Sequence, residues 1–184
     1  ESIYYDASVT VTGNSYVEAV NEDAIGIAAY ADEGDATVTI TGNLTVDGYN
    51  SAIGVVAYGY DSATIDMTGN LDVSSGDGPA IGAYAIADGG YASASVDGDV
   101  DVYGYTTGTG VAALGYTGAS VEVTGNLDVT GYNGVGVGAQ AYGLFGDATV
   151  TVGGGMDVYG YTDAYGAIAQ SAFGDATVDV TGYS

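Results

Sequence analysis

Residues 36–59 read ATVTITGNLTVDGYNSAIGVVAYG, and this stretch decides the fold class. Apolar and polar residues alternate strictly over residues 36–41, and the alternation resumes over residues 44–47 after a Gly-Asn dipeptide. A period of two residues indicates half-buried β-strands, and Gly-Asn is a corner signal. Gly, Val and Thr also disfavour a helix. The first half of the stretch therefore predicts two short strands joined by a tight corner.

A third strand is expected after the second corner, Gly-Tyr-Asn at residues 48–50. In this strand we expect Ile53, Val55 and Ala57 to point inward. Three strands in about 28 residues are too few to enclose a core, so such units must stack on one another. The sequence predicts an all-β fold, a parallel β-solenoid with three short strands in each coil. The crossover preference of parallel strands favours a right-handed coil.

The same pattern recurs along the chain, which we treat as one domain of residues 1–184. A β-propeller is the main rival, but its blades need about 40 residues and four strands. The pattern gives about six coils of ~28 residues. We place their starts at Ala7, Ala36, Ala63, Ala94, Ala119 and Ala148, with a partial repeat from Ala176.

The charge is one-sided: the chain has no Lys, Arg or His, 24 Asp plus Glu residues, and a formal net charge of -24. Without cations it cannot neutralise phosphates, so we expect no nucleic-acid partner, and an anionic bilayer would repel it. No apolar run approaches the ~20 residues of a membrane span, so no membrane insertion is expected. Divalent cations and glycans are the partners that this composition leaves open.

Carboxylates recur at outward positions and should form columns when the coils stack. Like charges at such positions repel, and relief must come from salt screening, protonation or bridging divalent cations. Oxygen ligands suit Ca²⁺, although an acidic face that is merely hydrated is the alternative. The candidate calcium ligands are one column of Asp72, Asp101, Asp128 and Asp157 and a second of Asp66, Asp97 and Glu122.

Asparagines recur at the first corner and should form a ladder from coil to coil, in which each side-chain amide hydrogen-bonds the asparagine of the next coil. The Asn43-Leu-Thr45 sequence is also a glycosylation sequon, but it occurs in only one copy, so we favour the ladder. The predicted ladder positions are Asn14, Asn43, Asn70 and Asn126, with Asp99 and Gly155 in the gaps. Tyrosines recur at the later corners, where they indicate packing or an aromatic track that binds sugars.

Catalysis is not expected, and no catalytic or cofactor-binding residue is assigned. Without His, Cys or Lys, a Ser-His-Asp triad, thiol chemistry and Schiff bases are excluded. The carboxylates repeat with the scaffold instead of converging at one place. We also expect small residues such as Gly134, Gly136 and Gly138 to occupy outer positions and leave little with which to build a pocket.

Residues 124–132, TGNLDVTGY, resemble the Gly- and Thr-rich repeats of large bacterial surface proteins, such as adhesins and autotransporter passenger regions. The resemblance implies export to the cell surface and an extended β-solenoid rod. The N-terminal residues have no basic region, so we expect any secretion signal to have been removed already.

The two ends suggest self-assembly. Neither carries a polar cap, and Ala176–Ser184 reads as the opening strand of a further coil. Bare solenoid ends favour strand addition. Two explanations fit these ends: the chain is a piece of a longer repetitive protein, or it is a structural extracellular fibre or matrix subunit that stacks head to tail with itself, and we favour the second. The alternative is the stalk segment of a cell-surface adhesin that binds glycans or neighbouring surfaces.

Overall fold

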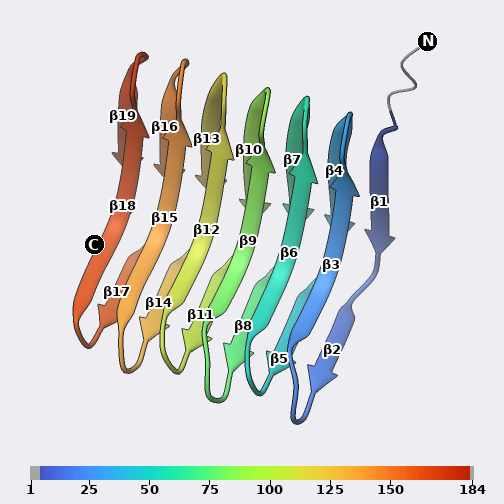
Figure 1. Cartoon of the computed structure of the whole chain (residues 1–184). Coiled ribbons are helices and arrows are strands. Elements are labelled where there is room, and N and C mark those ends of the chain that lie inside the picture. Colours follow the sequence, from blue (N-terminus) through green and yellow to red (C-terminus); the bar gives the residue numbers. More distant parts are fainter. Residues whose placement is uncertain (1–4, 183–184) are drawn as a thin grey trace.

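The computed structural model describes residues 5–182, and they form a β-solenoid of parallel strands (Figure 1). The predicted fold class is confirmed: the coils have three strands each, and no helix is present among the described residues. No described helix is therefore long and apolar enough to cross a membrane. Residues 183 and 184 of the expected seventh opening strand lie outside the described part.

The first strand of every coil lies in one seven-stranded sheet, here called sheet A. Its strands carry alternating Ala or Val and Thr or Ser, so their apolar side faces the core. In order they are β1 (Ala7–Thr12), β4 (Asp35–Thr41), β7 (Ser62–Thr68), β10 (Tyr91–Asp97), β13 (Gly118–Val123), β16 (Ala148–Val152) and β19 (Ala176–Val180).

The second strands form a six-stranded sheet, sheet B, and the third strands form another, sheet C. Sheet B contains β2 (Ser15–Ala19), β5 (Leu44–Gly48), β8 (Leu71–Ser75), β11 (Val100–Gly104), β14 (Leu127–Gly131) and β17 (Met156–Gly160). Sheet C contains β3 (Ala24–Ala31), β6 (Ala52–Gly59), β9 (Ala80–Ala87), β12 (Gly108–Gly115), β15 (Val135–Gly143) and β18 (Asp163–Ser171).

The core is a continuous apolar column enclosed by the three sheets. Val38 and Ile40 of sheet A, Leu44 of sheet B and Val55 of sheet C are almost completely buried, at 0–1% exposure. Burying one such side chain contributes about 1.5–3 kcal/mol. Since each coil shares its apolar residues with the coils on both sides, stability accumulates by stacking.

The register corrects one predicted coil start. Ala92, and not Ala94, pairs with Ala63 and with Ala119. A shift of two residues preserves the alternation, so the pattern alone does not reveal the error. The corner glycine fixes the register, because Gly69 adopts a φ of +128° that favours glycine. Ala63, the start of the third coil, lies six residues before Gly69. In the fourth coil the corner glycine is Gly98, and the residue six positions before it is Ala92.

The third strand corrects a predicted inward row. Val55 and Ala57 are buried as predicted, but Ile53 points outward and is half-buried. The alternation shifts at Gly54, which also points inward: a Cβ on Gly54 would lie 2.5 Å from Gly82 O and 2.8 Å from Val73 Cγ2. The pairing of β6 with β9 omits Gly54 but keeps the same register on both sides of it, so the neighbouring strands share this shift.

The same shift recurs in the later coils and reverses the predicted orientation of two glycines. Gly136 and Gly138 are buried, and the residue between them, Val137, faces outward. The outer positions of sheet C are therefore occupied by larger side chains than the sequence pattern suggested.

Candidate functional site

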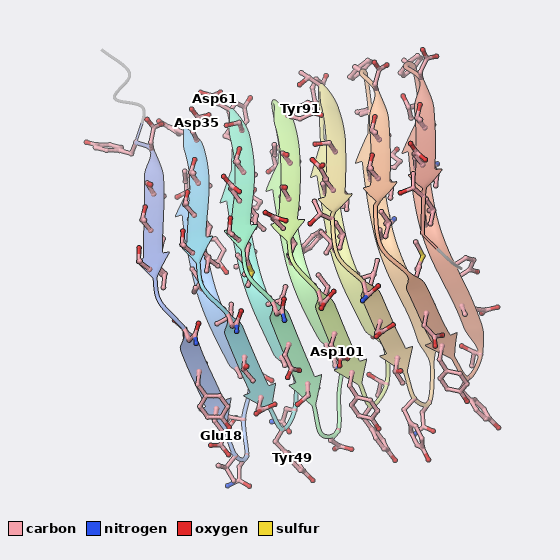
Figure 2. All side chains as sticks on the ribbon, turned by 180° about the vertical axis from the view of Figure 1, so that it is seen from behind. Glu18, Asp35, Tyr49, Asp61, Tyr91 and Asp101 are labelled. Atoms are coloured by element: carbon pink, nitrogen blue, oxygen red, sulfur yellow. The ribbon has the colours of Figure 1, made fainter. Side chains whose placement is uncertain are left out.

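An aspartate column runs along the outer face of sheet B. Asp72, Asp101, Asp128 and Asp157 pair with one another in β8, β11, β14 and β17, as the sequence predicted. Figure 2 shows Asp101 on the outer side of its strand. Because neighbouring strands lie about 4.8 Å apart, the column holds four carboxylates in successive layers, and the chain has no basic side chain to pair with them.

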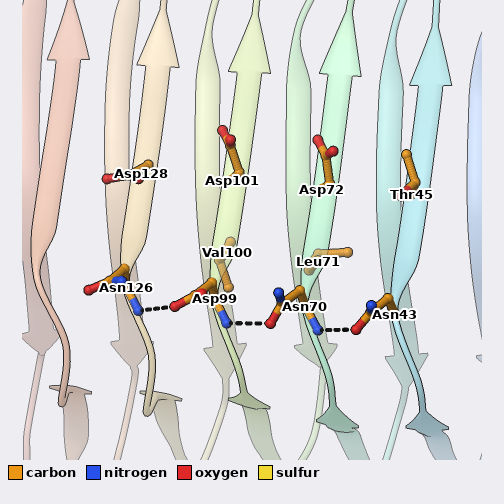
Figure 3. A pocket seen from close by; sticks show the side chains of 10 residues that line it. All are labelled: Asn43, Thr45, Asn70, Leu71, Asp72, Asp99, Val100, Asp101, Asn126 and Asp128. Atoms are coloured by element: carbon orange, nitrogen blue, oxygen red, sulfur yellow. Dashed lines mark hydrogen bonds between the residues drawn. The ribbon is translucent and has the colours of Figure 1, made fainter. Parts of the chain in front are cut away.

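The column borders a shallow groove of about 410 Å³ (Figure 3). Leu71 and Val100 also line this groove, and the side chains of the first corner form its other border. The corner residues that line it are Asn43, Asn70, Asp99 and Asn126. The groove is thus bordered on both sides by oxygen atoms.

The corner side chains form the predicted ladder, but the donors differ from the prediction. Each Oδ1 accepts a hydrogen bond from the backbone N–H of the next coil, and not from an amide side chain. Asn43 Oδ1 accepts from Asn70 N at 2.9 Å, and Asn70 Oδ1 accepts from Asp99 N at 3.1 Å. Asp99 Oδ1 accepts from Asn126 N at 2.8 Å. Aspartate can therefore replace asparagine, since only an acceptor is needed.

The second predicted acidic column does not exist as such. Asp66 and Glu122 occupy equivalent positions, but Ser95 lies between them. Asp97 belongs to the next outward position, where it pairs with Thr68 and accepts a hydrogen bond from Thr124 Oγ1 at 2.7 Å. The error follows from the misplaced start of the fourth coil. On sheet A, these acids are thus separated by neutral residues.

Repulsion between carboxylates is stronger in the uninterrupted aspartate column of sheet B than among the separated acids of sheet A. Partial burial raises the pKa of Asp101, and repulsion from Asp72 and Asp128 raises it further. Partial burial also raises the pKa of Asp72, with a smaller effect from Asp47. Both shifts have the same sign, because burial and neighbouring negative charge each disfavour the ionised carboxylate.

Asp47 lies beside this column and accepts hydrogen bonds from two hydroxyl groups. Tyr16 donates its phenolic O–H to Asp47 Oδ2 at 3.1 Å, and Ser74 donates its hydroxyl to Oδ1. The hydrogen bond to Asp47 is the main cause that raises the pKa of Tyr16 to about 12, with smaller effects from burial and from Glu18. Hydroxyl donors thus take the place that a basic side chain would have on an ordinary acidic surface.

Chemically, the groove can gather hydrated cations along a row of carboxylates and amide oxygens. Within residues 5–182, no group of three or more His, Cys, Asp or Glu side chains is close enough together to hold a metal ion. The carboxylates follow one another along the solenoid axis instead of surrounding a point. One coil therefore offers few protein ligands to a cation at this face.

Sequence reasoning missed the outer face of sheet C. Its outward positions were assigned to the core or to glycines, because the shift at Gly54 was not recognised. The signal was present: Ala-Ile-Gly followed by a second apolar run occurs in β3, β6 and β9. A glycine inside a strand pattern also signals a close approach of another backbone segment, which is what Gly54 and Gly82 show.

Comparisons with protein-family models, with curated proteins and with solved structures found no match for this chain.

Proposed function

We propose that this chain is a structural, non-catalytic rod of an extracellular fibre or matrix, and that copies of it stack end to end. The observation that carries the proposal is the repetition of the coil, since each coil pairs with the next through its strands and continues the same inward rows. Among the described residues, β1, β2 and β3 at one end and β17, β18 and β19 at the other have a strand neighbour on one side only. Such edges expose backbone N–H and C=O groups that another chain can pair with.

The edges are also matched in pattern. β19 reads Ala-Thr-Val-Asp-Val, and β1 reads Ala-Ser-Val-Thr-Val, so an incoming copy continues the same inward alanine and valine rows. Val178 of β19 is 47% exposed, whereas its partner in the preceding coil, Val150, is fully buried. When the first strand of an incoming coil takes this position together with its own second and third strands, the valine of this row is buried, which favours stacking.

Strand numbers define how two copies meet. Sheet A has seven strands and the other sheets have six, so β1 of an incoming copy and β19 of the first copy compete for one position. The first four residues of β19 are exposed, whereas β1 has alternate half-buried residues. We expect β19 to give way to β1, so that β2 and β3 of the incoming copy pair with β17 and β18. Each copy then adds six layers, about 29 Å.

Charge opposes this assembly. Each copy has a formal net charge of -24, so copies that meet end to end repel one another, although the aspartate column itself ends at Asp157 and the incoming β2 offers Tyr16 at that position. Salt, divalent cations such as Ca²⁺ or mild acid should therefore promote growth, by screening, bridging or neutralising carboxylates.

A proline in β1 tests the proposal. Gly13 donates its backbone N–H to Thr41 O, so by the alternation along a strand the N–H of Thr10 points to the free edge. Thr10→Pro removes this donor and obstructs pairing. With calcium at pH 5, we expect wild-type filaments in electron micrographs, filaments with Thr10→Val, and none with Thr10→Pro. Monomers of the wild-type chain across pH 4–8, with or without calcium, would refute the proposal.

A second candidate function is an adhesin stalk that binds glycans, and the exposed aromatic rows favour it. The rings of Tyr105 and Tyr132 stack with centroids 5.7 Å apart, and those of Phe145 and Phe173 with centroids 5.1 Å apart. Planar rings at a surface can pack against the apolar faces of sugars. Glycan-array binding by the monomer, lost in Tyr132→Ala, would support this function over the fibre.

A further inference from the structure

The outer face of sheet C carries no charged side chain in its three outward columns. Every sheet C strand contributes one residue to each column. The first column is Ile25, Ile53, Ile81, Thr109, Val137 and Tyr165; the second is Ala28, Val56, Tyr84, Ala112, Gln140 and Ile168; the third is Tyr30, Tyr58, Ile86, Leu114, Tyr142 and Gln170.

This neutrality contrasts with the other two faces of a chain that has 24 acidic residues. The outer face of sheet B carries the aspartate column together with Glu18 and Asp47, and that of sheet A carries Asp66, Asp97 and Glu122 among others. Two copies that approach through sheet A or sheet B bring like charges together. The outward columns of sheet C bring no like charges together, and its acids, Asp163 and the Asp88 that accepts a hydrogen bond from Tyr58, lie at the ends of the strands.

The face is large enough for a specific interface. Six strands of about eight residues span roughly 29 Å by 26 Å, or about 750 Å² on each copy. A stable protein–protein interface buries about 800 Å² on each partner.

The centre of the face is self-complementary in shape. Next to Tyr84 lies a hollow of about 240 Å³, with Ala112 between Tyr84 and Gln140 in the same column. Tyr84 and Ala112 pair across the adjacent strands β9 and β12, so a bulky side chain and a small one stand at the same height one strand apart.

We propose that two copies of this chain pair face to face through sheet C. The geometry points to a twofold axis that lies in the interface, runs parallel to the strands and passes between β9 and β12. Rotation about this axis places each Tyr84 over the Ala112 hollow of the other copy. Such an isologous contact closes at two copies, with the solenoid axes antiparallel and the acidic faces outward. The sheets would lie about 10 Å apart.

This pairing is independent of the end-to-end stacking proposed above, because it uses side chains of sheet C instead of strand edges. The two associations also differ in product: face pairing gives a closed dimer, and stacking gives an open polymer. High salt should preserve the dimer, since apolar burial and not charge holds it together.

Sedimentation velocity of the full chain tests the pairing. At neutral pH in 0.15 M NaCl with a chelator of divalent cations, conditions that do not promote end-to-end growth, we expect wild type to sediment as a dimer of the 18.1 kDa chain. Gln140→Glu adds a charge at the centre of the face with almost no change in shape, and we expect it to raise the dimer dissociation constant at least 100-fold. Asn133→Asp adds the same charge at an exposed corner and should leave the dimer intact. Tyr84→Ala should weaken it at least tenfold.

Equal dissociation constants for Gln140→Glu and Asn133→Asp would overturn the proposal, as would a wild-type monomer at 100 µM. Binding of that monomer to phosphatidylcholine vesicles would instead assign the face to a lipid surface, which also overturns it. Thermal melting followed by circular dichroism establishes that each variant is folded. Thr10→Pro should block filaments and keep the dimer, whereas Gln140→Glu should keep the filaments, so the two proposals can fail separately.

Discussion

Neutralising the middle of the aspartate column should stabilise the chain. Asp101 has Asp72 and Asp128 as direct neighbours on the two adjacent strands. For unit charges about 4.8 Å apart, each repulsion is worth about 0.9 kcal/mol at the dielectric constant of water. Salt at 0.15 M reduces it to about 0.5 kcal/mol, because the Debye length is about 8 Å. Asp101→Asn removes both repulsions, a gain of about 1 kcal/mol.

For a chain of this size, that gain corresponds to an increase in Tm of about 2–4 °C at pH 7. Differential scanning calorimetry measures the Tm of Asp101→Asn and of a control variant, Glu122→Gln. Glu122 is a suitable control because its partners on the two adjacent strands, Ser95 and Thr151, are uncharged. We expect a higher Tm for Asp101→Asn, little change for Glu122→Gln, and a difference that shrinks in 1 M NaCl. Equal shifts in the two variants, or a lower Tm for Asp101→Asn, would refute the electrostatic reasoning.

Three further predictions concern packing, the ladder and pH. Gly54→Ala should lower the free energy of unfolding by about 3 kcal/mol or more in urea titrations, since its Cβ would clash with backbone, while Gly76→Ala, whose Cβ meets a tyrosine ring at 3.3 Å, should cost less. Asn70→Ala should cost about 1 kcal/mol because Asp99 N loses its acceptor, and Asn70→Asp should retain the hydrogen bond; similar losses in both would contradict the ladder. The Tm should rise as the pH falls from 7 toward 4, because raised carboxyl pKa values make the folded state bind protons at higher pH than the unfolded state; a falling Tm over this range would contradict the sign.

The periodic features of the fold could be predicted from sequence because they are encoded locally. Alternation of period two marked the strands, and Gly-Asn corners marked the ends of β4 and β7. Stacking then aligned Asp72 with Asp101 without any further information. These features depend only on the side-chain period and on corner chemistry.

The remaining features depend on contacts between coils. The fourth coil starts at Ala92 because of its corner at Gly98. The alternation within the strand looks the same after a shift of two residues, so it does not reveal that Ala94 is the wrong start. The inward turn of Gly54 is set by the approach of Gly82 O from the next coil and of Val73 from sheet B. Because that turn decides which residues of sheet C face outward, sequence reasoning found the acidic faces and missed the apolar one.

The central claim is that the solenoid continues from one copy to the next. X-ray diffraction from aligned, calcium-treated material tests it most directly. We predict a strong meridional reflection at about 4.8 Å from strands stacked along the fibre, and an axial subunit repeat of about 29 Å from six layers per copy. Isotropic scattering from separate particles, with no axial repeat under any of the promoting conditions, would contradict it.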